Sequence, residues 1–218
     1  MAVDVKICGL STGAAVSAAV EAGADFLGFV FYPPSPRAIV PEHASVLGQL
    51  VPRHVRKVAL VVDAADSVIS DIVETARPDM LQCHGAETPQ QIGALKARFG
   101  LPVIKALSLS TRDDIGRARL YEETADYLLF DARPRPDQLP GGNGEIFDWT
   151  LLTGVAFEKP WFLSGGLNAA NLDEALRLSG AKLVDVSSGV ERQRGEKDVN
   201  LIRMFIQSAK KTREGHAA

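Results

Sequence analysis

The feature that most constrains this chain is an alternation of short apolar runs with amphipathic stretches, which continues from one end to the other. Alternation of this kind predicts parallel strands joined by right-handed helical crossovers. The β-branched or apolar runs predict eight strands, at 3–8, 26–31, 57–62, 80–84, 102–107, 127–131, 161–164 and 183–187.

The amphipathic stretches predict helices at 12–22, 41–50, 67–76, 89–99, 112–121, 169–178 and 200–210, while 149–153 is barely one turn. Eight strand–helix units predict a single-domain (β/α)8 TIM barrel over residues 1–211, followed by a frayed polar tail at 212–218. With 218 residues and no linker, the chain has no room for a second domain. An open doubly wound sheet is the alternative fold.

Charge and composition limit the classes of binding partner that we expect for this chain. The net charge is −3, with acids and bases mixed along the chain, which argues against a nucleic-acid or polybasic membrane footprint. No apolar run approaches ~20 residues and no signal-peptide pattern opens the chain. We therefore expect a cytoplasmic protein that binds neither nucleic acid nor membrane. Cys8 and Cys83, the two cysteines, are expected to be free thiols.

The first predicted strand carries chemistry on one face. Because strand side chains alternate, Asp4, Lys6 and Cys8 point one way and the aliphatic residues of 3–8 point the other. Cys8 ends the strand, where α/β proteins place their functional groups, and Gly9 lets the chain turn. Cys8 is either a small buried hydrophobe or a reactive thiol, and the Lys6 ammonium would favour its thiolate.

Two further residues are candidates for acid–base chemistry and anion binding. Asp131 ends the strand at 127–131, where burial and a nearby phosphate would raise its pKa and suit a general acid; the alternative is a turn cap. Arg37 lies in a proline-stiffened loop at 32–37. There its guanidinium would clamp a carboxylate, unless it is an ordinary solvated arginine.

Polar residues at the ends of two other predicted strands point the same way. Gln82 and His84 share one strand face, with Cys83 on the other. The Cys83–His84 pair lacks metal-ligand spacing, so no metal site is expected. Asp185 and Ser187 share the face predicted to point into the barrel.

Three glycine-rich turns, at 141–144, 164–168 and 187–191, follow the last three predicted strands. Glycines expose backbone N–H groups, and the loops after strands seven and eight commonly bind phosphate in barrels. Each turn alone is weak evidence, because glycine after a strand is more often plain turn chemistry, and the dinucleotide and nucleoside-triphosphate patterns are absent. Together they predict a phosphate site made by Gly142, Gly144, Gly165, Gly166, Asn168, Ser187, Ser188 and Gly189.

Taken in order, these motifs resemble the phosphoribosylanthranilate isomerase family of tryptophan biosynthesis, and the resemblance covers the whole chain. The matching motifs are Lys6-Ile7-Cys8-Gly9, Ser35-Pro36-Arg37, Gln82-x-His84-Gly85, Asp131, Gly141-Gly142-x-Gly144 with Phe147-x-Trp149, and the segments 164–168 and 185–191.

The resemblance implies an activity and a role for each motif. The family rearranges N-(5′-phosphoribosyl)anthranilate to 1-(2-carboxyphenylamino)-1-deoxyribulose 5-phosphate, with neither metal nor organic cofactor. It implies Cys8 as general base, Asp131 as general acid, Arg37 at the anthranilate carboxylate and the glycine loops at the phosphate. The other substrate-binding residues it implies are Lys6, Gln82, His84 and Asp185. We expect a monomer or a homodimer.

Two other functions compete with this interpretation. Aminoimidazole-carboxamide ribotide isomerase has similar phosphate loops but a carboxylate at the end of strand one, where this chain has Cys8. A non-catalytic barrel with Cys8 as a redox sensor would bind a phosphometabolite without turnover.

The chain also departs from the family pattern in two places. Cys83, expected to point outward, replaces an apolar residue, and 192–194 carries charge where a proline often precedes Gly195. The loops at 32–41 and 134–145 are candidate lids.

Overall fold

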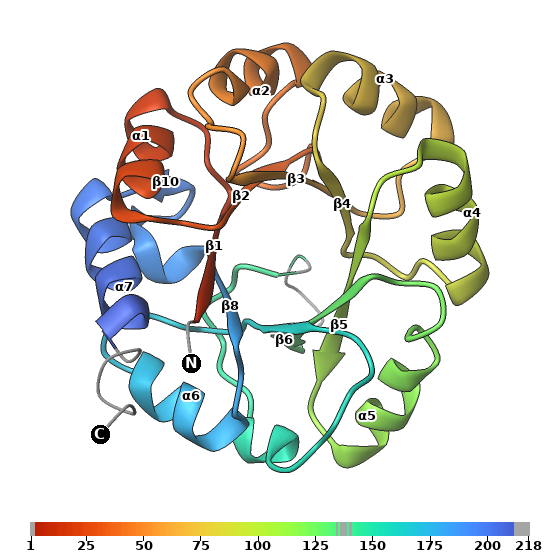
Figure 1. Ribbon diagram of the computed structural model, residues 1–218, viewed down its shortest axis with the longest axis vertical. Coiled ribbons are helices and arrows are strands. Elements are labelled where there is room, and N and C mark those ends of the chain that lie inside the picture. Colours follow the sequence, from red (N-terminus) through yellow and green to blue (C-terminus); the bar gives the residue numbers. More distant parts are fainter. Residues whose placement is uncertain (1–2, 134, 136–138, 140, 212–218) are drawn as a thin grey trace.

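The computed structural model describes residues 3–133, 135, 139 and 141–211. Its strands close into one parallel barrel in sequence order, ringed by helices (Figure 1). The barrel strands are β1 (Asp4–Cys8), β2 (Phe26–Val30), β3 (Arg56–Val61), β4 (Met80–Cys83), β5 (Val103–Leu109), β6 (Tyr127–Ala132), β7 (Trp161–Leu163) and β8 (Leu183–Val186). Strand β1 pairs with β8 as well as with β2, so the open-sheet alternative is wrong.

The outer ring follows the predicted pattern. It consists of α1 (Gly13–Ala22), α2 (Pro41–Gly48), α3 (Asp66–Ala76), α4 (Pro89–Phe99), α5 (Arg112–Arg119), α6 (Leu172–Ser179), α7 (Val199–Lys211) and the 3-10 turn η1 (Trp149–Leu152). None of these helices combines the length and apolarity that a membrane span needs, as far as the described residues extend. The expected tail, 212–218, lies outside the described residues.

The barrel has an apolar floor and a polar mouth. Side chains from alternating strand positions fill the floor, including Phe26, Leu129 and Phe162, and the Phe26 and Phe162 rings meet edge-to-face with centroids 5.2 Å apart. Burying each such side chain stabilises the fold by about 1.5–3 kcal/mol. Lys6 and Asp185 lie opposite each other in the β1–β8 register. The packed floor thus confines the polar groups to the carboxyl end of the barrel.

Local hydrogen bonding corrects one predicted boundary. The helix expected at 169–178 begins at Leu172, because Asn168 and Asn171 close a turn ahead of it. The Asn168 side-chain oxygen accepts from the backbone N–H groups of Ala170 and Asn171, and the Asn171 side chain accepts from the Asn168 N–H. Asn side chains that satisfy nearby backbone groups in this way compete with the helix.

The segment after β8 holds two elements that were not predicted from the sequence. A 3-10 turn, η2 (Ser188–Val190), leads into an antiparallel hairpin of β9 (Glu191–Gln193) and β10 (Glu196–Lys197). The hairpin precedes α7 and brings its inner side chains to the mouth of the barrel. It therefore adds charged groups beside the ends of β1 and β8.

Candidate active site

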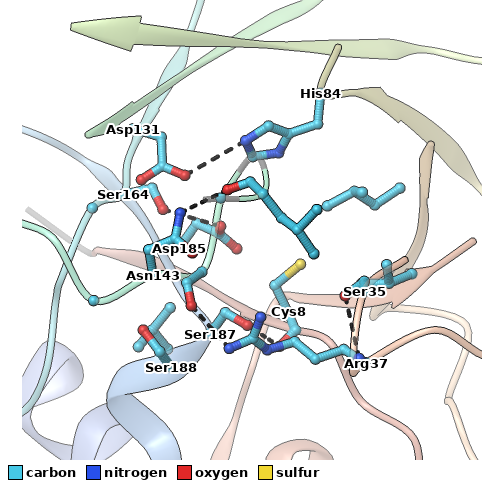
Figure 2. A pocket seen from close by; sticks show the side chains of 18 of the residues that line it. Cys8, Ser35, Arg37, His84, Asp131, Asn143, Ser164, Asp185, Ser187 and Ser188 are labelled. Carbon is cyan, nitrogen blue, oxygen red and sulfur yellow. Dashed lines mark hydrogen bonds and ion pairs between the residues drawn. The ribbon is translucent and has the colours of Figure 1, made fainter. Parts of the chain in front are cut away.

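A cavity opens at the carboxyl end of the barrel, where parallel barrels hold their sites. Figure 2 shows Cys8 from β1 and Asp131 from β6 entering it. Most of the residues predicted for the site line this cavity: Cys8, Arg37, Gln82, His84, Asp131, Gly142, Gly144, Gly165, Gly166, Asp185, Ser187 and Ser188. The barrel thus brings together residues that are far apart in the sequence.

Lys6 lies beneath the cavity lining. It is fully buried, and its ammonium donates to Asp185 Oδ1 over 2.8 Å. Burial lowers the pKa of Lys6, but its interactions with the Asp185 carboxylate and with the ionised form of Cys8 together outweigh that effect, so the pKa is raised. Ser164 donates to Asp185 Oδ2 over 3.3 Å. This arrangement orients Asp185 towards the cavity and keeps a positive charge below Cys8.

Burial and the positive charges around Cys8 shift its pKa in opposite directions. Burial raises the pKa of the thiol, and the Asp185 carboxylate adds to the rise. The ammonium groups of Lys6 and Lys197 act in the opposite direction without cancelling it. Lys6 therefore favours the Cys8 thiolate, as expected from the sequence, but desolvation of the anion is the larger effect, so the pKa stays raised.

Asp131 is held at both carboxylate oxygens. Oδ1 accepts from the Ala132 backbone N–H over 2.8 Å, and Oδ2 lies 3.5 Å from His84 Nε2. His84 Nδ1 in turn lies 3.1 Å from the Gln82 amide nitrogen. Gly141 packs over the His84 and Asp131 side chains, since a Cβ there would lie 2.9 Å from the His84 ring and 3.3 Å from Asp131 Oδ2. The carboxyl group is thus fixed with Oδ2 on the cavity side, which a simple turn cap would not require.

Arg37 is buried, so the solvated-arginine alternative is wrong. Its Nε and Nη2 donate to the two carboxylate oxygens of Glu191 over 2.6 and 2.9 Å, and Nη2 also donates to the Gly142 carbonyl over 3.0 Å. Glu191 therefore occupies one of the two edges at which a guanidinium can bind a carboxylate bidentately. Nη1 makes no hydrogen bond to another described residue, and Gly142 packs against it, since a Cβ there would lie 2.5 Å from Nη1.

Glu191 is a strongly stabilised carboxylate. Burial alone would raise its pKa, but hydrogen bonds from Arg37 and Lys197, and from the Gly195 backbone N–H, lower it to about 2. Lys197, from β10, is buried too, and burial lowers its pKa while the Glu191 carboxylate opposes that shift. Neither residue was assigned a role from the sequence, because both lie in a charged segment without the periodicity of a buried element.

The predicted phosphate loops meet at one side of the cavity. Gly165 adopts φ +83°, and a Cβ there would lie 2.9 Å from the Ala132 backbone nitrogen. Asn168 and Gly189 lie beside the cavity lining rather than in it. Asn168 closes the turn before α6, and a Cβ on Gly189 would lie 1.9 Å from the Leu167 carbonyl oxygen. Both residues therefore shape the loops instead of facing the cavity.

The structure shows where the two departures from the family pattern lie, Cys83 and the charged segment at 192–194. Cys83 points outward into the core between the barrel and its helices, as expected. Arg194 lines the cavity, so the charged segment at 192–194 does reach the rim. Arg192 is instead paired with Glu196 on the exposed side of the hairpin.

Comparison with known proteins agrees with this geometry. A family model described as N-(5′-phosphoribosyl)anthranilate (PRA) isomerase matches residues 5–208. This chain belongs to that family. A relative of that name from Parvibaculum lavamentivorans is 52% identical over 214 residues, 97% of this chain and 100% of the relative. Another, from Paramagnetospirillum magneticum, is 48% identical over 211 residues, covering 96% and 98%.

Solved structures give the same answer. Phosphoribosyl anthranilate isomerase from Thermotoga maritima superposes with a TM-score of 0.87 at 38% identity, covering 96% of this chain and 99% of that one. Another structure of the enzyme is a complex with reduced 1-(o-carboxyphenylamino)-1-deoxyribulose 5-phosphate. It has a TM-score of 0.82 at 35% identity, again with 96% and 99% coverage. The similarity extends over the whole barrel, including every strand that contributes to the cavity.

Proposed function

We propose that this chain catalyses the Amadori rearrangement of N-(5-phospho-β-D-ribosyl)anthranilate to 1-(2-carboxyphenylamino)-1-deoxy-D-ribulose 5-phosphate in tryptophan biosynthesis. One observation carries the proposal: in a chain of this family, Cys8 and Asp131 enter one cavity from β1 and β6. A thiol and a carboxyl group facing one space suit a reaction that needs an acid and a base at neighbouring sugar atoms.

Asp131 acts first, as the general acid. Its carboxyl proton passes to the furanose ring oxygen as the C1′–O bond breaks, and the nitrogen lone pair forms a cationic Schiff base at C1′. The contacts from Ala132 and His84 hold the carboxyl group in one orientation for this transfer. A positioned proton donor typically contributes ~10²–10⁴ in rate.

Cys8 acts second, as the general base. The thiol first loses its own proton to water, and the thiolate then takes the proton from C2′. The electron pair of the broken C–H bond moves to the cationic nitrogen, giving an enolamine. Burial raises the pKa of the resting thiol. The cation formed at C1′ would favour the thiolate at the moment it is needed. The enolamine then gains a proton at C1′ and loses the 2′-hydroxyl proton as the ketone forms, so the isomerisation is proton-neutral.

The substrate carries two anionic groups, its carboxylate and its phosphate, and binding of both orients it in the cavity. The side of Arg37 that Glu191 leaves free is proposed to bind the anthranilate carboxylate, and the glycine loops after β6, β7 and β8 the phosphate. Gln82, His84 and Asp185 line the cavity near the reacting sugar, and Lys6 acts through Asp185. Fixing both ends of a substrate lowers the entropic part of the barrier.

The rest of the proposal concerns cofactors and assembly. The iminium nitrogen accepts the electrons, so the mechanism uses neither metal nor organic cofactor. One Thermotoga maritima structure is described as coming from a dimeric enzyme, and for this chain we propose a monomer or a homodimer in the cytoplasm.

A fluorescence assay tests the function directly. Purified protein is mixed with freshly made phosphoribosylanthranilate, and separately with the aminoimidazole-carboxamide ribotide substrate. We expect rapid consumption of the first and none of the second. Turnover of only the second would support the other isomerase, and binding without turnover of either would support the non-catalytic barrel.

A further inference from the structure

A cluster of buried charges lies between the carboxylate clamp and the catalytic thiol. It contains two cations, Arg37 and Lys197, and one carboxylate, Glu191, and the side chains of all three are at most 6% exposed. The cluster therefore carries one net positive charge at the edge of the cavity. A buried net charge is unfavourable unless an opposite charge approaches, so the cluster favours an anionic ligand.

Lys197 is the centre of this cluster. Its ammonium donates to Glu191 Oε1 over 2.7 Å, to the Ser187 carbonyl over 2.8 Å and to the Ser187 hydroxyl over 3.1 Å. Three acceptors match the three donors of a charged ammonium. With its side chain only 1% exposed, Lys197 is saturated by the protein and has no donor left for a ligand. Its effect on a ligand must therefore pass through its neighbours.

Glu191 and Ser187, which accept hydrogen bonds from Lys197, contact Arg37 and the backbone of Cys8, respectively. Glu191 receives Lys197 on one oxygen and grips Arg37 with both, which sets the direction of the free Nη1. On the other side, the Ser187 hydroxyl donates to the Cys8 carbonyl over 3.1 Å, which ties the end of β8 to the end of β1. The positive charge of Lys197 also favours the Cys8 thiolate against the effect of burial.

We propose that Lys197 is a positioning residue for both halves of the site: through Glu191 it orients the Arg37 clamp, and through Ser187 it places the backbone of Cys8. The inference deepens the proposed function and rests on it for the identity of the ligand. It assigns a role to the hairpin β9–β10, which was not predicted from the sequence.

The test compares Lys197→Met with wild type, both in a Cys83→Ala background so that Cys8 is the remaining thiol. The first readout is inhibition by a product analogue and by the same analogue without its carboxylate. The preference for the carboxylate should fall about ten- to hundredfold, the range for one charge-assisted hydrogen bond. The second readout is alkylation of Cys8 by iodoacetamide at a fixed, mildly alkaline pH. It should be about three- to tenfold slower, because less of the thiol is ionised.

Lys105→Met is the matched control. Lys105 is equally buried and also pairs with one carboxylate, Glu87, at 2.7 Å, but it lies on the outward face of β5. Its loss should lower the melting temperature comparably while leaving the carboxylate preference and the alkylation rate within about twofold. If the effects came from a general loss of stability in the barrel, Lys197→Met and Lys105→Met would change the carboxylate preference and the alkylation rate to the same extent.

A second variant keeps the inference testable if Lys197→Met does not fold. Glu191→Gln removes the negative charge of the cluster, so alkylation of Cys8 should be unchanged or faster. The carboxylate preference should still fall if orientation of Arg37, and not the net charge of the cluster, sets it, because the variant loses the paired carboxylate that holds Nε and Nη2. Slower alkylation in Glu191→Gln, or an unchanged carboxylate preference in folded Lys197→Met, would overturn the inference. Neither readout needs turnover, so failure of the proposed reaction would be seen separately.

Discussion

Gly28→Ala is expected to slow catalysis severely while leaving the protein folded. Gly28 lies on β2 in register with Cys8, and its backbone carbonyl accepts from Gly9 and Leu10 just after β1. A Cβ at this position would lie 2.8 Å from Cys8 Sγ, 3.1 Å from Cys8 Cα and 3.2 Å from Lys6 Nζ. These separations are well inside contact distance, so the thiol must move to make room for the methyl group.

The structure sets the size of the effect. Overpacking by one methyl group typically costs about 1–3 kcal/mol, and in a chain of this length each kcal/mol lowers the melting temperature by about 2–4 °C. A reacting group displaced by ~1 Å can lose about a hundredfold in rate. We therefore expect a folded variant that melts a few degrees lower and has a kcat about a hundredfold lower, measured by substrate fluorescence and thermal unfolding.

Gly116→Ala provides the control for this prediction. Gly116 lies on α5, and a Cβ there would have no neighbouring atom within 4 Å, so the same substitution meets open space. Because alanine is favoured in helices, this variant should be stabilised by about 0.5–1 kcal/mol and keep its turnover. A Gly28→Ala enzyme with kcat within about twofold of wild type would show that catalysis does not depend on the position of the Cys8 sulfur.

Three further predictions concern charged groups. Arg37→Lys keeps the charge but loses the planar fork, so KM should rise by the equivalent of about 1.5–3 kcal/mol with little change in kcat, measured by initial rates. Asp131→Asn keeps the shape without the transferable proton; kcat should fall about 10²–10⁴-fold while a product analogue still binds, measured by calorimetry. Glu191 has its pKa lowered from 4.5 to about 2, so its stabilisation is complete above pH 4.5 and lost as the pH falls towards 2. In that window wild type should lose about 3 kcal/mol that Glu191→Gln does not lose, measured by urea unfolding.

The fold could be predicted from the sequence because its evidence is periodic. Each strand run alternates or is fully apolar, and each helix has a stripe of apolar residues, so the eight-unit order and the closed barrel follow. The alternation in 3–8 also placed Lys6 and Cys8 on the face opposite the aliphatic residues. In the structure those aliphatic residues pack in the outer core, while Cys8 lines the cavity. The predicted helix start at 169 was wrong, because Asn168 and Asn171 satisfy the backbone locally and delay the helix to Leu172, which periodicity does not detect.

The site was only partly predictable from the sequence. The residues that were missed are charged residues buried by pairing with one another. Cys8 and Asp131 ended apolar strands, so their position was visible in the sequence, and Arg37 stood out in a proline-rich loop. Glu191 and Lys197 lie in a polar hairpin that reads as exposed, and their burial depends on each other and on Arg37. Pairing of distant charges leaves no local signal. The sequence indicated that Lys6 favours the Cys8 thiolate, but the larger effect of desolvation has no local signal, because it depends on the whole barrel mouth.

The most direct test of the account is turnover of phosphoribosylanthranilate by Cys8→Ala beside Cys83→Ala. Both residues are buried thiols, but Cys8 lines the cavity, whereas Cys83 faces outward and burial raises its pKa to about 12. With both variants folded by circular dichroism, Cys8→Ala should lose about 10²–10⁴-fold in kcat and Cys83→Ala should match wild type. Near-normal turnover by Cys8→Ala, or an equal loss in Cys83→Ala, would contradict the assignment of Cys8 as the general base.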